Sequence, residues 1–469
     1  MSKPVQLRVS ALAACLCACL LAAGASAQEG PYANYLVGER SLGLAGAFVA
    51  VADDASAIFH NPGGTAGLAT TSASGSLWAL LRGSKVVQNG YHTDLGSTDL
   101  EQSAPLSLPL FLAGVVKFGP RQADRVRPHA LGAALFTPYT REDRFVEQLD
   151  DGSMAVDRLE VRQQDRARWL GASYGLRVRP GLAFGISSFL ALRTLQHDEV
   201  ELRAREATDM AATAGPSWNR AATLSVDAQH LVVRLGTQLD LTHELRAGVM
   251  FQLPGIRLGD SATAEALLTT AGPAPTTIDR QRETNLEVHM PLPWELRMGV
   301  TVLQPEETLL TLDVSLFGGE GDPSDPKPLV VPKNVPLGAF VPAETYRRTA
   351  LRGAIGFESV VSNKLPLRGG LFFERSSAPP VLSISDVYTR DHVDTMGASL
   401  SVGWRFAGYD LSVGSTAVLG WGEAFALRRD ADFAAEARYE AARVRTAAIM
   451  VFVGGAKSAM KQLVQTLLE

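Results

Sequence analysis

The sequence predicts an all-β fold: an antiparallel transmembrane β-barrel of about 14 strands, preceded by an export signal and an N-terminal hatch, or plug. Three observations support this prediction. Apolar residues alternate with small or polar residues over long stretches, and the connections between the stretches are alternately short and long. In addition, no segment after the signal has about 18 consecutive apolar residues, the length that a spanning helix needs. An exported chain of this kind is either soluble or a closed barrel.

Period-2 alternation identifies the individual strands. In TMGASLSVGWRF (395–406), one face carries Met396, Leu400 and Trp404, whereas the other carries threonine, glycine, serine and arginine. Such stretches have the length of tilted membrane-spanning strands, whereas a soluble sandwich or propeller needs strands of only about 5–6 residues. The predicted strands are residues 72–84, 106–118, 128–139, 167–179, 182–204, 224–240, 244–257, 293–303, 308–318, 347–358, 365–375, 395–406, 409–421 and 443–454.

The connections between these strands alternate in length. Residues 179–181, 304–308 and 407–410 are short links. Short turns on one rim and long loops on the other are typical of outer-membrane barrels, and a soluble sandwich has no need to sort its loops in this way. The predicted long loops are residues 85–105, 140–166, 205–223, 258–292, 319–346, 376–394 and 422–442.

The first 27 residues have the features of an export signal peptide. Lys3 and Arg8 supply its positive region, an apolar run follows, and Ala25-Ser26-Ala27 is a cleavage site. Because LAAC (12–15) also resembles a lipoprotein signal, lipidation at Cys15 stays open beside cleavage after Ala27. All three cysteines lie in this segment, so we expect no disulfide and no cysteine-bound metal in the mature chain.

Residues 28–69 do not alternate, and we expect them to form a compact hatch inside the barrel rather than an extension that merely begins it. SLGLAGAFVAVA (41–52) reads as a short helix, which Asp53 and Asp54 end and whose following turn they cap. Pro62 biases Asn61 away from the helical region, and Gly63 and Gly64 allow a left-handed backbone. A barrel of about fourteen strands is wide enough to need such a filling.

The expected parts are thus a signal peptide (1–27), a hatch (28–69), a barrel (70–456) and an amphipathic tail (457–469). In the tail, apolar residues recur at helical spacing. We expect either a short C-terminal helix, which lies on the periplasmic membrane face or docks onto a partner, or an ill-ordered end. These apolar residues are Met460, Leu463, Val464, Leu467 and Leu468.

Few residues point to catalytic chemistry. The net charge is −5, which gives no basic footprint for nucleic acid. The eight histidines are scattered, and no metal-binding pattern appears among them. GASYG (171–175) matches the G-x-S-x-G pattern around Ser173, but it lies inside a predicted strand without the sharp turn that such a nucleophile needs. We therefore expect a protein that is not an enzyme, with no cofactor and no metal.

ERSLGLAGAFVAVADDASAIFHNPGGTAGLA (39–69) resembles the N-terminal hatch of the FadL/TodX-type outer-membrane transporters of hydrophobic compounds. The strand hairpins at residues 290–317, 365–380 and 394–414 resemble segments of the same family, as does ALFTPYT (134–140), its aromatic-proline stretch. The resemblance is spread over most of the mature chain, and the hatch is its most specific part.

This resemblance implies that the hatch contacts a gap in the wall at a kinked third strand, through which hydrophobic substrates leave sideways. Asn61 and Pro62 match the family's hatch motif, whereas Gly63 replaces its usual alanine and Gly64 is part of an insertion. Pro138 is either the kink in the third strand or an ordinary loop starter. The segment Asn61 to Gly64 is the expected hinge of the gate.

The expected function is passive uptake of long-chain fatty acids or hydrocarbons across the bacterial outer membrane. Its expected partners are a hydrophobic ligand, outer-membrane lipid with lipopolysaccharide, and the barrel-assembly machinery. Two other classes stay open: a scaffold barrel for protein secretion or surface anchoring, and an outer-membrane enzyme. The apolar loop 326–342 either receives the ligand at the barrel mouth or packs on neighbouring loops, through Val330, Val331, Leu337 and Phe340.

Overall fold

The structure is a computed structural model of the chain. It describes residues 37–103, 109–122, 124–152, 155–206, 215–272, 275–304, 308–322, 327–335, 345–361, 364–381, 384–385, 391–406, 408–430 and 438–458. The signal peptide with Cys15, the start of the hatch, and residues 459–469 of the tail lie outside this range, so the predictions made for them stay predictions. Within the described ranges, no helix is long and apolar enough to cross a membrane.

The described chain is almost entirely β-structure. Three short helices, α2 (Glu39–Gly43), α3 (Ala57–His60) and α4 (Pro62–Gly67), precede the first strand. The strands are β1 (Ser72–Thr93), β2 (Gly96–Ser103), β3 (Leu110–Phe118), β4 (His129–Asp150), β5 (Val156–Arg179), β6 (Leu182–Ala204), β7 (Ser217–Asp240), β8 (Leu245–Gln252), β9 (Ile256–Ala271), β10 (Thr277–Thr284), β11 (Glu287–Val288), β12 (Glu295–Gln304), β13 (Thr308–Phe317), β14 (Val330–Val331), β15 (Ala350–Val361), β16 (Leu365–Glu374), β17 (Ile384–Ser385), β18 (His392–Phe406), β19 (Tyr409–Arg428) and β20 (Arg438–Ser458).

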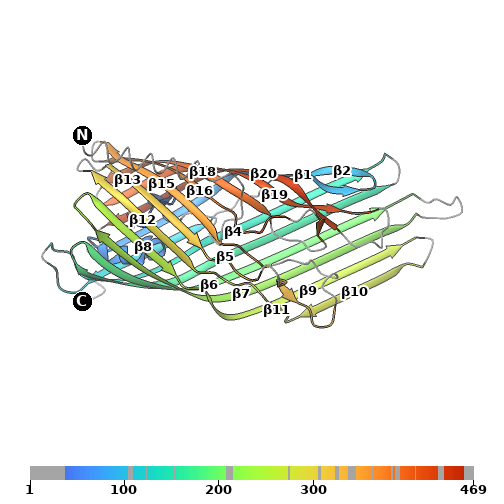
Figure 1. The fold of residues 1–469 in the computed structure, drawn as a ribbon, viewed down its shortest axis with the longest axis horizontal. Coiled ribbons are helices and arrows are strands. Elements are labelled where there is room, and N and C mark those ends of the chain that lie inside the picture. The colour runs from blue at the N-terminus through green and yellow to red at the C-terminus, as the bar shows by residue number, and fades with distance from the viewer. Residues whose placement is uncertain are drawn as a thin grey trace.

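Antiparallel pairing closes these strands into a barrel. The ring runs from β1 through β3, β4, β5, β6, β7, β8, β12, β13, β15, β16, β18 and β19 to β20, which pairs with β1 again. This ring confirms the predicted barrel of about fourteen strands. The hairpin β9–β10 continues the wall beyond β8, next to the outer half of β7, and lengthens one side of the barrel (Figure 1).

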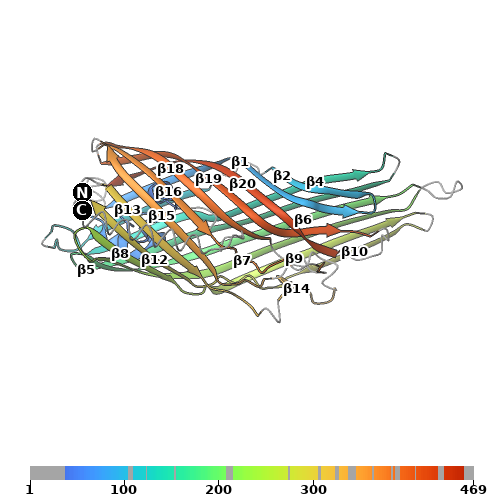
Figure 2. The same ribbon diagram turned by 45° about the horizontal axis from the view of Figure 1, so that its top comes forward.

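The two faces of each strand differ as the alternation predicts. On β5, Leu170, Tyr174 and Val178 point outward and are 55%, 39% and 54% exposed, whereas the intervening Ser173 is buried in the lumen. The outward residues of the neighbouring strands extend this apolar belt, and these strands run side by side toward the short-turn end of the barrel (Figure 2). An outward belt of this kind is the surface that a membrane-spanning barrel presents to lipid.

The strands are longer than predicted. Much of the predicted long loops 85–105, 140–166 and 258–292 is strand, because β1 extends to Thr93, β4 to Asp150, and β9 and β10 form a hairpin. The prediction stopped where the outward residues become polar and the contrast between the two faces disappears. The backbone ladder does not depend on that contrast and continues beyond the apolar belt.

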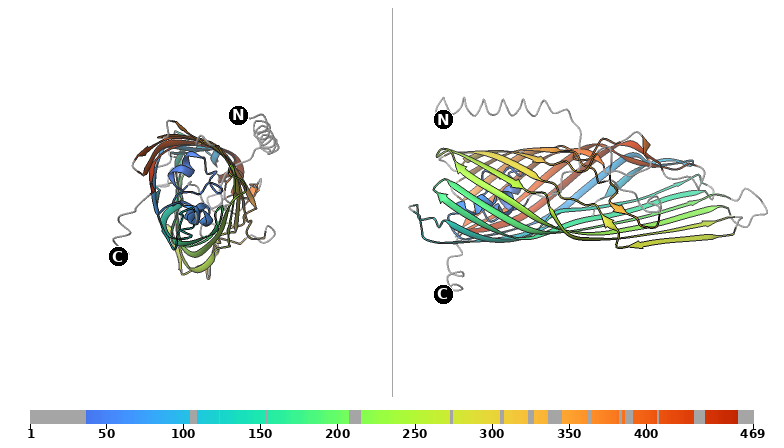
Figure 3. Two further views of the ribbon diagram at one scale, coloured as in Figure 1. Left: turned by 90° about the vertical axis from the view of Figure 1, so that its left-hand side faces the viewer. Right: turned by 60° about the horizontal axis from the view of Figure 1, so that its bottom comes forward.

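The hatch lies inside the short-turn end of the barrel, as the view along the axis shows (Figure 3). The predicted helix over residues 41–52 is wrong beyond Gly43. Ala45 and Gly46 take left-handed φ values of 54° and 85°. The N–H groups of Phe48 and Val49 then donate to Oδ2 of Asp313 on β13, at 2.6 and 2.7 Å. A wall carboxylate thus takes the donors that a continuing helix would use internally.

Candidate functional site

Asn61, in the predicted hinge, connects the hatch with the wall. Its side-chain amide donates to the Val49 carbonyl at 2.9 Å and to the Thr237 carbonyl of β7 at 2.8 Å. Its Oδ1 accepts the N–H of Gly63 at 3.1 Å and so caps α4, in which Pro62 is the first residue. The prediction that Asn61 leaves the helical region is confirmed by its φ of −160°.

The wall facing the hatch carries glycines where any side chain would collide. A Cβ on Gly236 would lie 2.2 Å from Asn61 Oδ1, and one on Gly185 would lie 2.2 Å from the Pro62 carbonyl oxygen. These two glycines are direct cross-strand neighbours. Equivalent close approaches between wall and hatch occur on other strands, at Gly175, Gly248, Gly356 and Gly370. The hatch therefore fits against the wall through bare backbone.

Gly63 permits close packing against the wall and Gly64 permits close packing within the hatch, and neither takes a left-handed conformation. Both lie within the short helix α4. A Cβ on Gly63 would lie 2.9 Å from the Thr237 Cα, and one on Gly64 would lie 2.1 Å from the Ala52 carbonyl oxygen. The expected left-handed conformation is wrong, and close packing is the physical reason for glycine at these positions.

The predicted capping role applies to one of the two hatch aspartates. Asp54 Oδ1 accepts the N–H of Ser56 at 2.7 Å. Asp53 instead pairs with Arg40. Arg40 also donates to Glu358 of β15 at 2.8 Å, so this side chain ties the hatch to the wall.

Two hatch carboxyl groups are buried without full compensation. Burial raises the pKa of Asp54 to about 6. Burial, followed by repulsion from Asp54, raises the pKa of Glu39 well above its ordinary value. His60 responds in the opposite direction, because burial lowers its pKa and keeps the imidazole neutral. Its Nε2 lies 2.7 Å from the Val37 carbonyl oxygen.

Arg234 of β7 is a wall residue that the sequence did not indicate. It is 2% exposed and points into the barrel. Its guanidinium lies 4.0 Å from the centre of the Phe59 ring, and Nη1 donates to the Phe59 carbonyl at 2.5 Å. Glu295 of β12 balances its charge at 3.1 Å. The contact holds the hatch through a cation–π interaction and a hydrogen bond together.

Aromatic side chains of the wall cover the same hatch residue. The ring of Phe59 lies 5.0 Å from that of Phe136 on β4 and 6.1 Å from that of Trp169 on β5, both in edge-to-face geometry. Phe189 of β6 lies 5.5 Å from Phe136 and continues the group. The hatch therefore meets an apolar cluster on the β4–β6 side of the lumen.

Pro138 lies inside β4 and does not begin a loop. The register between β4 and β5 shifts between Phe136 and Tyr139, which is a β-bulge at Thr137 and Pro138. On the other side of β4, pairing with β3 extends only from His129 to Phe136 in the described part of the chain. The predicted third strand (128–139) is too short, because β4 continues to Asp150. The bulge nevertheless falls at Pro138, the residue predicted to kink this strand.

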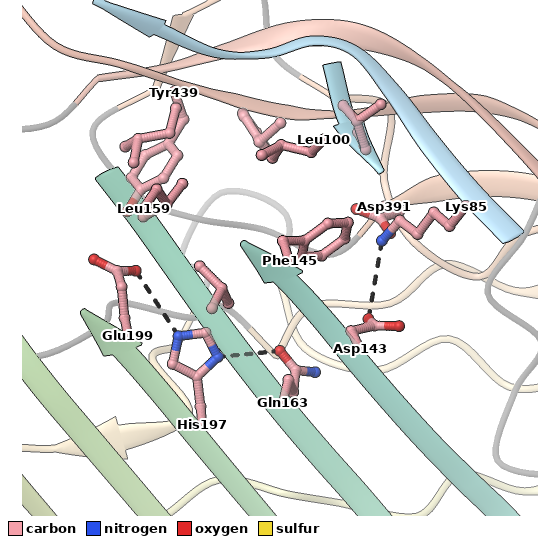
Figure 4. A pocket seen from close by; sticks show the side chains of 15 residues that line it. Lys85, Leu100, Asp143, Phe145, Leu159, Gln163, His197, Glu199, Asp391 and Tyr439 are labelled. Carbon is pink, nitrogen blue, oxygen red and sulfur yellow. Dashed lines mark hydrogen bonds and ion pairs between the residues drawn. The ribbon is translucent and has the colours of Figure 1, made fainter. Parts of the chain in front are cut away.

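The other half of the lumen holds a pocket with a cavity volume of about 70 Å³. Its walls come from β1, β2, β4, β5, β6, β19 and β20, strands that are far apart in the sequence (Figure 4). Apolar side chains form most of the lining: Val87, Leu100, Phe145, Leu159, Val161, Ala424, Phe425, Leu427 and Tyr439. The sequence prediction missed them because all nine lie in segments that it assigned to the loops 85–105, 140–166 and 422–442.

Charged residues border this pocket in balanced groups. Lys85 pairs with Asp391 and lies 3.9 Å from Asp143. Arg141 pairs with the same two carboxylates. On the opposite side (Figure 4), His197 Nδ1 lies 3.2 Å from Gln163 Oε1, and Nε2 lies 3.9 Å from Glu199.

A layer of buried ion pairs follows the pocket along β6, on the side away from the hatch. Arg203 is 1% exposed and donates to Asp157 of β5 at 3.2 Å and to Asp94 at 2.9 Å. Arg429 donates to Glu201 at 3.0 Å. Such pairs are costly to break, because each lost partner leaves a buried charge. They fix the strands around this end of the pocket.

The predicted ligand-receiving loop is only partly described. Val330 lies in β14, which pairs with β11. It is 2% exposed and packs with Leu286, Val288 and residues of β6, β7 and β9. Val331 is half-buried, and Leu337 and Phe340 lie outside the described residues. For Val330, packing on neighbouring segments is what the structure shows.

A closed antiparallel barrel with a hatch and an apolar pocket in its lumen has the architecture of an outer-membrane transport barrel. The chain has the fold of the FadL/TodX-type transporters. It is similar to a Pseudomonas aeruginosa FadL homologue, with 12% identity over 92% of this chain and 100% of that one and a TM-score of 0.62.

Two toluene transporters are also similar. TodX from P. putida shares 15% identity over 91% of this chain and 99% of that one, with a TM-score of 0.57. TbuX from Ralstonia pickettii shares 15% identity over 90% of this chain and 98% of that one, with a TM-score of 0.56. No protein-family model and no curated protein matches the sequence.

Proposed function

We propose that the protein is an outer-membrane channel for passive uptake of hydrophobic compounds. The observation that carries this proposal is the division of the lumen, with a wall-anchored hatch in the short-turn half and an apolar pocket in the other. The polar saccharides of the outer leaflet exclude apolar molecules, so a protein must offer them a shielded path. Burial of apolar surface, at about 25 cal/mol per Å², provides the attraction.

The pocket favours a neutral, compact ligand over a fatty-acid anion. Lys85 and Arg141 are matched by Asp143 and Asp391, so a carboxylate would have to displace an existing ion pair. The cavity of about 70 Å³ is smaller than the cavity of about 150 Å³ that binds benzene elsewhere. The pocket must therefore expand to admit even a one-ring hydrocarbon, and it must expand further for a long acyl chain.

Release is proposed to be sideways, gated by the hatch. The bulge at Pro138 lies where the pairing of β4 with β3 ends, next to the apolar cluster that contacts Phe59. A rearrangement of the segment from Asn61 to Gly64 would open this cluster. Pro62→Ala is then expected to lower uptake without lowering the amount of folded barrel, and unchanged uptake would remove the hinge role.

The first experiment is mass spectrometry of small molecules extracted from the protein in mild detergent, with an unrelated barrel as control. Binding of toluene and of laurate to the same preparation is then compared. Enrichment of neutral apolar compounds and preference for toluene support the proposal. A barrel that carries no apolar compound, but copurifies with stoichiometric protein, would favour the scaffold function instead.

A further inference from the structure

The outer surface of β5 carries a row of arginines beyond the apolar belt. Arg158, Arg162, Arg166 and Arg168 are all exposed. The odd-numbered residues between them point inward, and among these Leu159 lines the lumenal pocket. Because successive side chains of a strand alternate between faces, one strand here builds the pocket inside and a cationic row outside.

A fifth arginine meets this row from the next strand. Arg144 of β4 lies directly opposite Arg162 in the register of the two strands. Their side chains are 62% and 53% exposed. Like charges directly opposite each other destabilise a sheet, so the fold gains nothing from this arrangement. An anion placed between the two guanidinium groups would relieve it.

The carboxylates on this face neutralise it only in part. Glu142 lies 3.7 Å from Arg162 and 3.3 Å from Arg166. Glu160 lies 3.5 Å from Arg144 and 3.6 Å from Arg158. Exposed ion pairs of this kind contribute little to stability.

Positive charge remains in excess on this face. Asp198 of β6 is the cross-strand neighbour of Arg162 and adds a third carboxylate. Arg168 is exposed at the belt end of the row. With the exposed Asp150 at the outer end of β4 included, the five arginines of the face still outnumber its four acidic side chains.

The position of the arginine row along the barrel axis, relative to the apolar belt, indicates what the row can bind. Leu170, 55% exposed, is the last apolar outward residue of β5 on this side of the belt. Arg168 is the next outward residue, so it lies where the acyl chains of a membrane end. At about 3.3 Å per residue, Arg158 lies roughly 30 Å further along the tilted strand. The row thus begins at the depth of the lipid headgroups and extends outward beyond it.

We propose that this arginine face, formed by Arg144, Arg158, Arg162, Arg166 and Arg168, binds the phosphate groups of the outer-leaflet glycolipid lipopolysaccharide. The proposal rests on the proposed function, which places the chain in the outer membrane. Guanidinium groups hold phosphate oxygens through paired hydrogen bonds. Clusters of basic residues beside an apolar membrane surface bind anionic lipid headgroups. The face anchors the outer half of β4 and β5, whose inner sides form the pocket.

The test compares two double variants of the full-length protein in detergent. Arg144→Gln with Arg162→Gln removes the opposed pair. Arg280→Gln with Arg282→Gln is the matched control, because these two outward side chains are 62% and 57% exposed and lie on the β9–β10 hairpin. Binding to fluorescent deep-rough lipopolysaccharide is measured for both variants. Heat-modifiable migration in SDS–polyacrylamide gels shows that both barrels are folded.

The face variant is expected to bind lipopolysaccharide at least about tenfold more weakly, since each surface arginine contributes about a factor of five, whereas the control binds within about twofold of the parent. Equal weakening in both variants, or none in either, would overturn the proposal. Complete displacement by inorganic phosphate at moderate concentration would identify a free-phosphate site and overturn the lipid assignment.

Toluene binding in detergent separates this result from the proposed transport function. It is expected to be unchanged in both variants, because the arginine face lies outside the lumen. Loss of lipopolysaccharide binding with normal toluene binding supports the face. Normal lipopolysaccharide binding by a parent protein that binds no toluene would contradict only the transport function.

Discussion

Asn61 holds together three stretches of backbone that belong to the hatch loop, helix α4 and the wall. Asn61→Ala leaves the Val49 and Thr237 carbonyls without this donor, in a site where Asn61 is fully buried. We expect the hatch to lose about 1–3 kcal/mol of docking free energy. Hydrogen exchange of peptides from residues 38–60 measures this loss, and the barrel strands serve as the internal reference. Unchanged exchange would show that the wall contact is dispensable.

The wall glycines permit a second substitution test at this scale. A Cβ at Gly185 would lie 2.2 Å from the Pro62 carbonyl oxygen, whereas a Cβ at Gly353 of β15 meets nothing within 4 Å. Gly185→Ala is therefore expected to displace the hatch and raise the leak of small polar solutes into vesicles several-fold. Gly353→Ala is the control and should leave the leak unchanged. Equal leaks in the two variants would contradict a close fit.

Strand positions could be predicted from the sequence only where the two faces differ in polarity. Predicted residues 182–204 coincide with β6, and 308–318 nearly coincide with β13. Across residues 156–166 of β5, charged residues face out and mixed residues face in, so the segment resembled a loop. The helix predicted in the hatch was wrong for a different reason: Asp313, far away in the sequence, accepts the backbone N–H groups of Phe48 and Val49.

The bulge in β4 leads to a prediction at the scale of one strand. Between Phe136 and Tyr139, β4 has one residue more than the facing part of β5. Deletion of Pro138 would restore a continuous register, whereas Pro138→Ala keeps the extra residue. If the bulge maintains the sideways exit, the deletion lowers uptake of a labelled one-ring hydrocarbon several-fold and the substitution much less. Full uptake by a folded deletion variant would exclude an exit at this bulge.

The candidate site as a whole could be only half predicted. The hatch turn is one continuous segment, so its residues from Asn61 to Gly64 were visible as a motif. The pocket collects single residues such as Val87, Leu159 and Tyr439 from strands that are neighbours only after the barrel closes. No local pattern marks them.

The molecule as a whole contains a hatch whose buried acids make its docking dependent on pH. Burial raises the pKa of Asp54 in the docked hatch to about 6, above the ordinary aspartate value of 3.8, and the pKa of Glu39 is raised as well. Since the docked form binds more protons between about pH 4 and pH 6, its stability rises as the pH falls through this window. Above this pH window, the buried carboxylates are charged and oppose docking. Asp53 adds repulsion on Asp54, and Arg40 compensates part of the charge.

Hatch peptides are therefore expected to be about tenfold better protected from hydrogen exchange near pH 5 than near pH 7.5, after correction for intrinsic rates. The double variant Glu39→Gln with Asp54→Asn should lose this dependence and stay protected at the higher pH. Protection that falls on acidification in the parent protein would contradict the assignment. A dependence that persists in the double variant would move the titrating group elsewhere. His60 is not expected to provide it, because burial keeps that side chain neutral across this range.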